Sequence, residues 1–293
     1  MTPIVLSAAL AATISVPGGQ PNVQAAVDAA SNGDTIVVGP GVHVGSFVID
    51  KPLTLRGAGA GTTILESDSD SVLARVSFAG PVVIEDLTLD GAGTGRVLRT
   101  QNPGAEVRVT RVDLRGGAPG NDVEGDYGVT CLFQDGSVVL TDVSMTDPSV
   151  TLPSAPWSGG SKIIGWSAEI TLIRAELANG TSADSGMIGT DNGSLTIIDS
   201  HLHDGTLRSG GGGAASVWRT PTYVEGSVFE GFECLSNDCW GGVLDIGEAD
   251  LVVVGSHFGS VTGMEGAGHI YAPQSLDVSG SYFHDATTRW SGG

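Results

Sequence analysis

Two tryptophans and one carboxylate, Trp166, Trp218 and Asp191, each stand four residues before a copy of a repeated sequence pattern. Flat aromatic rings on either side of a carboxylate suit a sugar chain, because pyranose rings stack on aromatic faces and sugar hydroxyls bond to the acid. Amphipathic rings also commonly cover the apolar edge of a fold. The spacing therefore predicts a substrate-binding face for carbohydrate, with an edge cover as the alternative.

Arg219 and Asp245 lie close to the same positions, and with Asp191 they are the candidates for catalysis. Acid–base catalysis requires a basic group or a pair of acids on one strand face. Only these three residues offer such a set in the repeats. The sequence shows no serine-nucleophile motif and no phosphate-binding glycine loop.

Two alternating acidic runs are candidate metal sites. They are Glu66, Asp68, Asp70 and Asp122, Glu124, Asp126. Ca²⁺ takes about six to eight oxygen ligands, and three carboxylates supply part of such a set. Neither run has EF-hand spacing, so solvated loop charge is the alternative. Ca²⁺ is the one cofactor that the sequence suggests.

Three cysteines are present. Cys234 and Cys239 lie in one short loop, and their spacing allows a loop-closing disulfide. Cys131 lies in an apolar run, where a buried thiol is expected.

The chain carries 33 acidic and 13 basic residues, for a net charge of −20. Nucleic acid and anionic membranes are therefore unsuitable partners, because the long-range field repels them. Residues 1–12 resemble a signal peptide, with an apolar core and an Ala-x-Ala-like site but no basic start. No later stretch is long and apolar enough to span a bilayer. We expect an exported protein, secreted or at the cell surface, with residues 13–293 as one domain.

The elements that must position these residues follow from the repeated pattern, which places apolar residues at alternating positions around a bend. Successive copies start 25 to 32 residues apart, a period typical of solenoids. The copies begin at Val82, Val107, Val138, Ile170, Leu195, Thr222, Leu251 and Leu276.

The short repeats, the 45 glycines and the few aromatics favour short strands joined by tight turns. We therefore predict an all-β fold, a single parallel β-helix of about ten coils, each with about three strands. Residues 13–34 form its N-terminal cap. In the cap, the apolar spacing from Val23 predicts a helix that Asn22 begins and Asn32-Gly33 ends.

Two further positions of the repeat should serve the stack. The bend residues are Asp86, Arg111, Asp142, Arg174 and Asp199, followed by Gly226, Gly255 and Gly280. Stacking in register makes acid and base alternate up one edge. The next position is serine in the last four copies, Ser200, Ser227, Ser256 and Ser281. Inward-pointing serines must hydrogen-bond to each other or to the backbone, because an unsatisfied buried hydroxyl is costly.

The block 22–65, with the sequence from Val23 to His43 and from Phe47 to Gly59, resembles the cap and first coils of pectin-lyase-like right-handed parallel β-helix proteins. The resemblance implies that fold for the chain. It also implies two classes of function, because the superfamily contains polysaccharide lyases and hydrolases as well as non-catalytic surface proteins.

Within that resemblance, the lyases use an Arg or Lys base near Ca²⁺-binding carboxylates, and the hydrolases use aspartate motifs that this chain lacks. We therefore expect a structural or carbohydrate-binding surface protein whose partners are polysaccharide or other surface proteins. A polysaccharide lyase or glycoside hydrolase is the alternative. After Asp285 no capping element is visible, so we expect the chain to continue, a partner to cover this end, or the tail to cap it.

Overall fold

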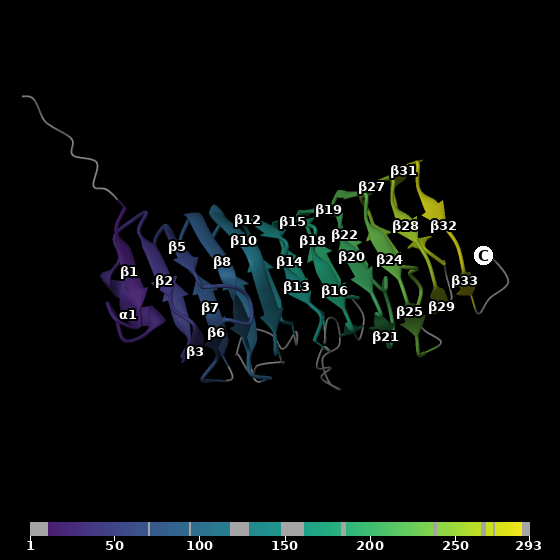
Figure 1. The fold of residues 1–293 in the computed structure, drawn as a ribbon. Coiled ribbons are helices and arrows are strands. Elements are labelled where there is room, and N and C mark those ends of the chain that lie inside the picture. Colours follow the sequence, from purple (N-terminus) through teal and green to yellow (C-terminus); the bar gives the residue numbers. More distant parts are fainter. Residues whose placement is uncertain are drawn as a thin grey trace, which may run out of the picture.

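The computed structural model describes residues 11–69, 71–93, 95–117, 129–147, 161–182, 186–236, 239–264, 268–271 and 273–288. These residues wind into an elongated stack of coils that runs from the N-terminal helix to the C-terminal strands (Figure 1). Neighbouring coils pair in parallel along three sheets. The predicted all-β parallel β-helix is therefore confirmed. Within the described ranges, no helix is long and apolar enough to cross a membrane.

The largest sheet has nineteen strands and folds around a bend in each coil. Its strands are β1 (Thr13–Val16), β2 (Thr35–Val38), β3 (Gly41–Val44), β5 (Leu53–Arg56), β6 (Thr63–Glu66), β8 (Gly80–Asp90), β10 (Ala105–Arg115), β12 (Ser137–Thr141), β13 (Ser144–Met145), β15 (Glu169–Ile173), β16 (Glu176–Ala178), β19 (Ser194–Ile198), β20 (His201–His203), β23 (Thr222–Glu225), β24 (Val228–Glu230), β27 (Asp250–Val254), β28 (His257–Phe258), β31 (Ser275–Ser279) and β32 (Tyr282–Phe283).

The other two sheets have nine and five strands. The nine-stranded sheet contains β4 (Phe47–Ile49), β7 (Val72–Val76), β9 (Arg96–Thr100), β11 (Cys131–Gln134), β14 (Ile163–Trp166), β18 (Ile188–Asp191), β22 (Ala215–Trp218), β26 (Leu244–Gly247) and β30 (Ile270–Tyr271). The five-stranded sheet contains β17 (Thr181–Ser182), β21 (Thr206–Leu207), β25 (Phe232–Cys234), β29 (Val261–Met264) and β33 (Ala286–Thr288). The nine strands of the second sheet correspond to nine coils, close to the ten predicted.

The repeated pattern sets the register of the stack. Each of its eight starting residues pairs with the next one, from Val82 with Val107 to Leu251 with Leu276. Apolar positions of the pattern point inward and form one core that runs through the solenoid. In the later coils, Phe229, Phe258 and Phe283 stack with ring centroids 4.7 Å apart. Stacking is what buries each apolar row, since no single coil has a core of its own.

Helix α1 (Val23–Ala29) lies against the first coil, where Val23, Ala26 and Val27 are buried. The Asn22 side chain accepts a hydrogen bond from the Ala25 N–H at 2.9 Å, as predicted for the helix start. The helix ends earlier than predicted. Ala30 is already extended, so the chain leaves the helix before the Asn-Gly pair.

The bend carries the predicted alternation of charge. Every bend residue from Asp86 to Gly280 has a positive φ, between 48° and 61°. The Arg111 guanidinium bonds to Asp86 at 2.6 and 2.9 Å, and Arg174 bonds to Asp142 at 2.6 and 2.8 Å. These hydrogen bonds lower the pKa of both carboxyls. The charge ladder is thus confirmed, and each arginine bonds to the aspartate of the preceding coil.

The serines next to the bend form a continuous hydrogen-bonded column. The Ser227 hydroxyl donates to the Glu225 carbonyl at 2.8 Å and accepts from the Ser200 N–H at 3.1 Å. Ser200, Ser256 and Ser281 repeat this arrangement one coil at a time. The buried hydroxyls bond to the backbone, which is the second of the two predicted solutions.

The last described coil differs from the others in burial. Leu276 and Val278 occupy inward positions of the pattern, opposite Leu251 and Val253, but are 49% and 38% exposed. Among the described residues, nothing covers the apolar interior at this end of the stack.

Candidate functional site

Trp166, Asp191 and Trp218 form one column on the outer face of the nine-stranded sheet. Trp166 pairs with Asp191 in register, and Asp191 pairs with Trp218. We call these three residues the aromatic column. Its backbone positions span two strand spacings, about 10 Å. The predicted alignment of the three residues is therefore confirmed, and the column continues to Gln134 on one side and Gly247 on the other.

Both tryptophans present their rings to solvent from the last positions of strands β14 and β22. In β22, Ala215 and Val217 are buried while Trp218 is 48% exposed. Trp166 ends β14 in the same way and is 37% exposed. Alternation along a strand sends neighbouring side chains to opposite faces. The column thus carries a large aromatic surface away from the core.

The Trp218 ring lies over the backbone of the next coil. A Cβ placed on Gly247 would lie 2.0 Å from the Trp218 Cε3 and 2.3 Å from its Cζ3. Any side chain at position 247 would therefore occupy the space of the indole. The ring is seated on β26 rather than over Asp191.

Arg219 holds Asp191 with one amino group. Its Nη2 bonds to both carboxylate oxygens of Asp191, each at 2.9 Å. Arg219 follows β22 directly and has a φ of +48°, which turns the chain at the corner of the coil. The pair sits between the two tryptophans and offers carboxylate oxygens and guanidinium N–H groups to a polar ligand.

Asp245 does not join this pair. It lies on β26, two residues before Gly247, and pairs in register with Ser216 and Tyr271. Two strand spacings and two residues along the strand separate its backbone from that of Asp191, roughly 12 Å.

The candidate metal ligands lie only partly within the described residues. Asp122, Glu124 and Asp126 lie outside the described residues, as does Asp70. The Asp68 carboxylate accepts hydrogen bonds from the Ser46 N–H and hydroxyl. No group of three His, Cys, Asp or Glu side chains in the described part of the chain is arranged to hold a metal ion.

The cysteine predictions are confirmed. Cys234 and Cys239 form a disulfide with their Cα atoms 6.2 Å apart. Cys131 is a free, fully buried thiol, and burial raises its pKa to about 12.

Lys162 is a basic residue that the sequence did not single out. It precedes β14, is 2% exposed, and donates from Nζ to the Asp147 carbonyl. Burial lowers its pKa to about 8. A lysine of that pKa is chemically suited to act as a base. Its burial, however, keeps it from contact with a ligand on the surface.

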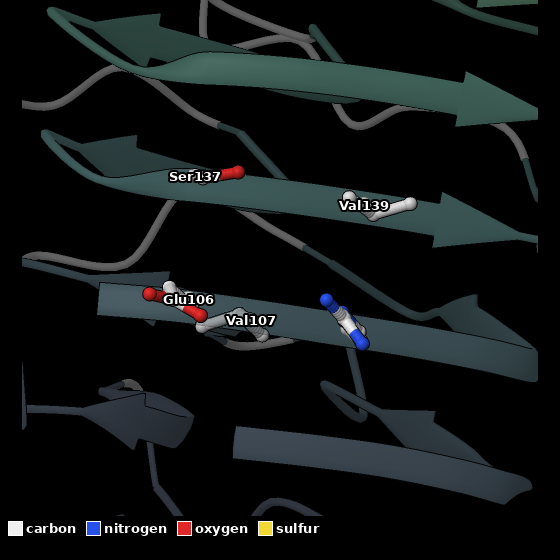
Figure 2. Close-up of a pocket in the computed structure, with 5 residues that line it drawn as sticks. Glu106, Val107, Ser137 and Val139 are labelled. Atoms are coloured by element: carbon white, nitrogen blue, oxygen red, sulfur yellow. The ribbon is translucent and has the colours of Figure 1, made fainter. Parts of the chain in front are cut away.

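A shallow depression of about 260 Å³ lies on a different face from the aromatic column. Figure 2 shows its lining on the neighbouring strands β10 and β12, from Glu106 and Val107 to Ser137 and Val139. These strands belong to the nineteen-stranded sheet. The aromatic column and this depression therefore lie on different sheets.

No protein-family model and no curated protein matches the sequence. Solved structures do match. A pectin methylesterase mutant in complex with a hexasaccharide is 9% identical, with 92% of each chain covered and a TM-score of 0.52. The ORF18 protein of Geobacillus virus E2 is 10% identical with a TM-score of 0.50, and the match covers 89% of this chain and 57% of that one. The chain thus shares the parallel β-helix fold of these solved structures.

Proposed function

We propose that this protein is exported and binds a polysaccharide through the aromatic column on the nine-stranded sheet. The observation that carries the proposal is the register of Trp166, Asp191 and Trp218 on one solvent-facing column. Both rings are more than a third exposed, so their apolar faces are available without rearrangement of the core. Sugar rings offer C–H faces to such rings and hydroxyls to the acid between them.

The Asp191–Arg219 pair supports binding of hydroxyl groups. A carboxylate accepts from two sugar hydroxyls, and a guanidinium donates to ring and hydroxyl oxygens. The arginine also fixes the carboxylate, so little side-chain freedom is lost when a ligand binds. Tryptophan and arginine are the residue types that dominate the binding free energy of many interfaces.

Export is supported by the disulfide and by the sequence start. Disulfides persist in oxidising compartments and are rare in the cytosol. Cys234 and Cys239 form one here. The signal-like sequence of residues 1–12 and the net charge of −20 suit an exported, soluble or surface-attached protein.

The alternative, a polysaccharide lyase or glycoside hydrolase, has weaker support from the geometry. One structural neighbour is a pectin methylesterase in complex with a hexasaccharide, which has the same fold. In this chain, however, the Arg219 guanidinium already bonds to both carboxylate oxygens of Asp191, so the two candidate groups are engaged with each other. Binding is therefore the function that the site supports best.

A glycan panel tests the proposal. The full chain is titrated by calorimetry with neutral and uronate-containing polysaccharides, next to the Trp166→Ala and Trp218→Ala variants. Tyr282→Ala is the matched control, because Tyr282 is 64% exposed on a different sheet. Parallel incubations follow reducing ends and unsaturated-product absorbance.

We expect at least one polysaccharide to bind wild type and the Tyr282 variant, and affinity to fall about tenfold or more in each tryptophan variant. Unchanged affinity in both tryptophan variants overturns the proposal. Turnover that disappears in Asp191→Asn or Arg219→Ala would establish the enzymatic alternative instead.

A further inference from the structure

We infer that a second sugar subsite lies beside the aromatic column, formed by Trp218, Asp245 and Tyr271 and made possible by Gly247. This inference rests on the proposed glycan binding and extends it toward the C-terminal coils. The three side chains come from adjacent strands of one sheet, β22, β26 and β30.

The Trp218 ring lies against the backbone of the neighbouring strand β26. The indole covers the backbone of Gly247, since a Cβ there would lie 2.0 Å from its six-membered ring. Gly247 does not have a positive φ, so backbone geometry does not require glycine at this position. The missing side chain instead lets the ring lie on β26. The opposite face of the ring is open to solvent, and Trp218 is 48% exposed.

Asp245 provides a carboxylate on the strand that Trp218 covers. It lies on the same face of β26 as Gly247, two residues earlier, which is about 7 Å along the strand. Its side chain packs against Gly241, where a Cβ would lie 2.6 Å from the Asp245 Cβ. The close approach of Gly241 restricts the Asp245 side chain, and the register places Asp245 diagonally across from Trp218 on the neighbouring strand.

Tyr271 provides a second aromatic ring on the next strand, β30. It pairs with Asp245 in register from the neighbouring strand, about 4.8 Å away. It is 39% exposed, and its partner Ile270 points inward. A tyrosine offers an apolar ring and a hydroxyl that donates or accepts. Trp218 thus forms the floor of the subsite, and Tyr271 and Asp245 form its far wall.

The charges indicate the class of sugar. Asp245 adds a carboxylate to the subsite, while the nearby Arg219 is already paired with Asp191. The chain as a whole carries a net charge of −20. A uronate would meet repulsion from both, whereas a neutral pyranose offers hydroxyl donors to the acid. The subsite therefore fits a neutral sugar residue.

Three variants test the subsite in the full chain, by calorimetry with neutral hexasaccharides of glucose, galactose and xylose and with hexagalacturonate as the charged comparison. Tyr271→Ala removes the wall and Asp245→Asn removes the charge. Gly247→Ala displaces the indole. Gly39→Ala is the matched glycine control, because a Cβ there meets no atom closer than 3.5 Å. Thermal unfolding establishes that each variant is folded.

We expect Tyr271→Ala and Gly247→Ala each to weaken binding of the neutral hexasaccharide about three- to tenfold, with Gly39→Ala unchanged. Asp245→Asn should lower the affinity for the neutral sugar and reduce discrimination against hexagalacturonate. If Trp166→Ala and Trp218→Ala lose binding while Tyr271→Ala and Asp245→Asn do not, the subsite is wrong and the proposed function stands. If hexagalacturonate binds more tightly than every neutral sugar, the assigned sugar class is wrong.

Discussion

The molecule uses the same arginine–aspartate pair in two places, with different surroundings. At the bend of the nineteen-stranded sheet, Arg174 bonds to Asp142, and both side chains face neighbouring members of a charge ladder. On the nine-stranded sheet, Arg219 bonds to Asp191 between two exposed tryptophans. In both pairs the arginine has a positive φ and bonds to an aspartate of the preceding coil. An ion pair alone therefore does not identify a site, and the neighbouring side chains do.

The charged and serine side chains at and beside the bend form hydrogen bonds with neighbouring coils. The charge ladder and the serine column join each coil to the next, so their hydrogen bonds contribute to stability and register. On the nine-stranded sheet, Trp218 and Tyr271 leave large surfaces in solvent. We infer that the first region holds the coils in register and the second binds a ligand. Substitutions in each region can distinguish these two roles.

The largest expected effect is on stability and comes from the serine column. Ser227→Ala removes the acceptor of the buried Ser200 N–H, which should lower the free energy of unfolding by about 1–3 kcal/mol. Urea unfolding measures the loss, and calorimetry should show unchanged glycan affinity. Ser281→Ala, in the more exposed last coil, is the control and should cost less. Equal losses in both variants would contradict the role of burial.

A matched pair of aspartate variants compares the two regions directly. Asp191→Asn should weaken glycan binding about tenfold, because the amide is a poorer acceptor for sugar hydroxyls and for Arg219. Its effect on unfolding should be small, since the pair is partly exposed. Calorimetry and urea unfolding of the same samples measure both quantities.

Asp142→Asn is the counterpart at the bend. It breaks an exposed ion pair with Arg174, so the free energy of unfolding should fall by about 0–1 kcal/mol with no change in binding. A change of glycan affinity in this variant, or none in Asp191→Asn, would remove the distinction between the two regions.

The same ladder makes a smaller, pH-dependent contribution. Hydrogen bonds from Arg111 and Arg174 lower the pKa of Asp86 and Asp142 in the folded chain. A lowered pKa adds stability that is fully present above the unfolded value, about 4, and is lost as the pH falls through the folded value. The stability difference between wild type and Asp142→Asn should therefore shrink below about pH 4. Urea unfolding at pH 3 and pH 6 measures it, and a constant difference would be the contrary result.

The sequence predicted the parts of this molecule that depend on repetition. The period and its alternating apolar residues determine which residues of successive coils pair, so Trp166, Asp191 and Trp218 could be aligned before any coordinates were known. The ladder at the bend followed from the same register. Repetition is informative because each coil packs only on its neighbours.

The sequence did not predict features that depend on how one side chain lies on the next coil. The contact of the Trp218 ring with Gly247 depends on the side-chain conformation of Trp218, which the spacing of residues in the sequence does not determine. Asp245 is near Asp191 in the pattern, yet the register places it two strands away and two residues along β26. Tyr271 lies five residues before the last copy of the repeat, one residue away from the position that aligns Trp166, Asp191 and Trp218.

The most direct test of glycan binding is a calorimetric titration of wild type, Trp218→Ala and Tyr282→Ala with the polysaccharide that binds best in the panel. The account predicts saturable binding to wild type and to the Tyr282 variant, and an affinity at least about tenfold lower for the Trp218 variant. Equal affinity in all three proteins, or binding to no polysaccharide at all, would contradict it.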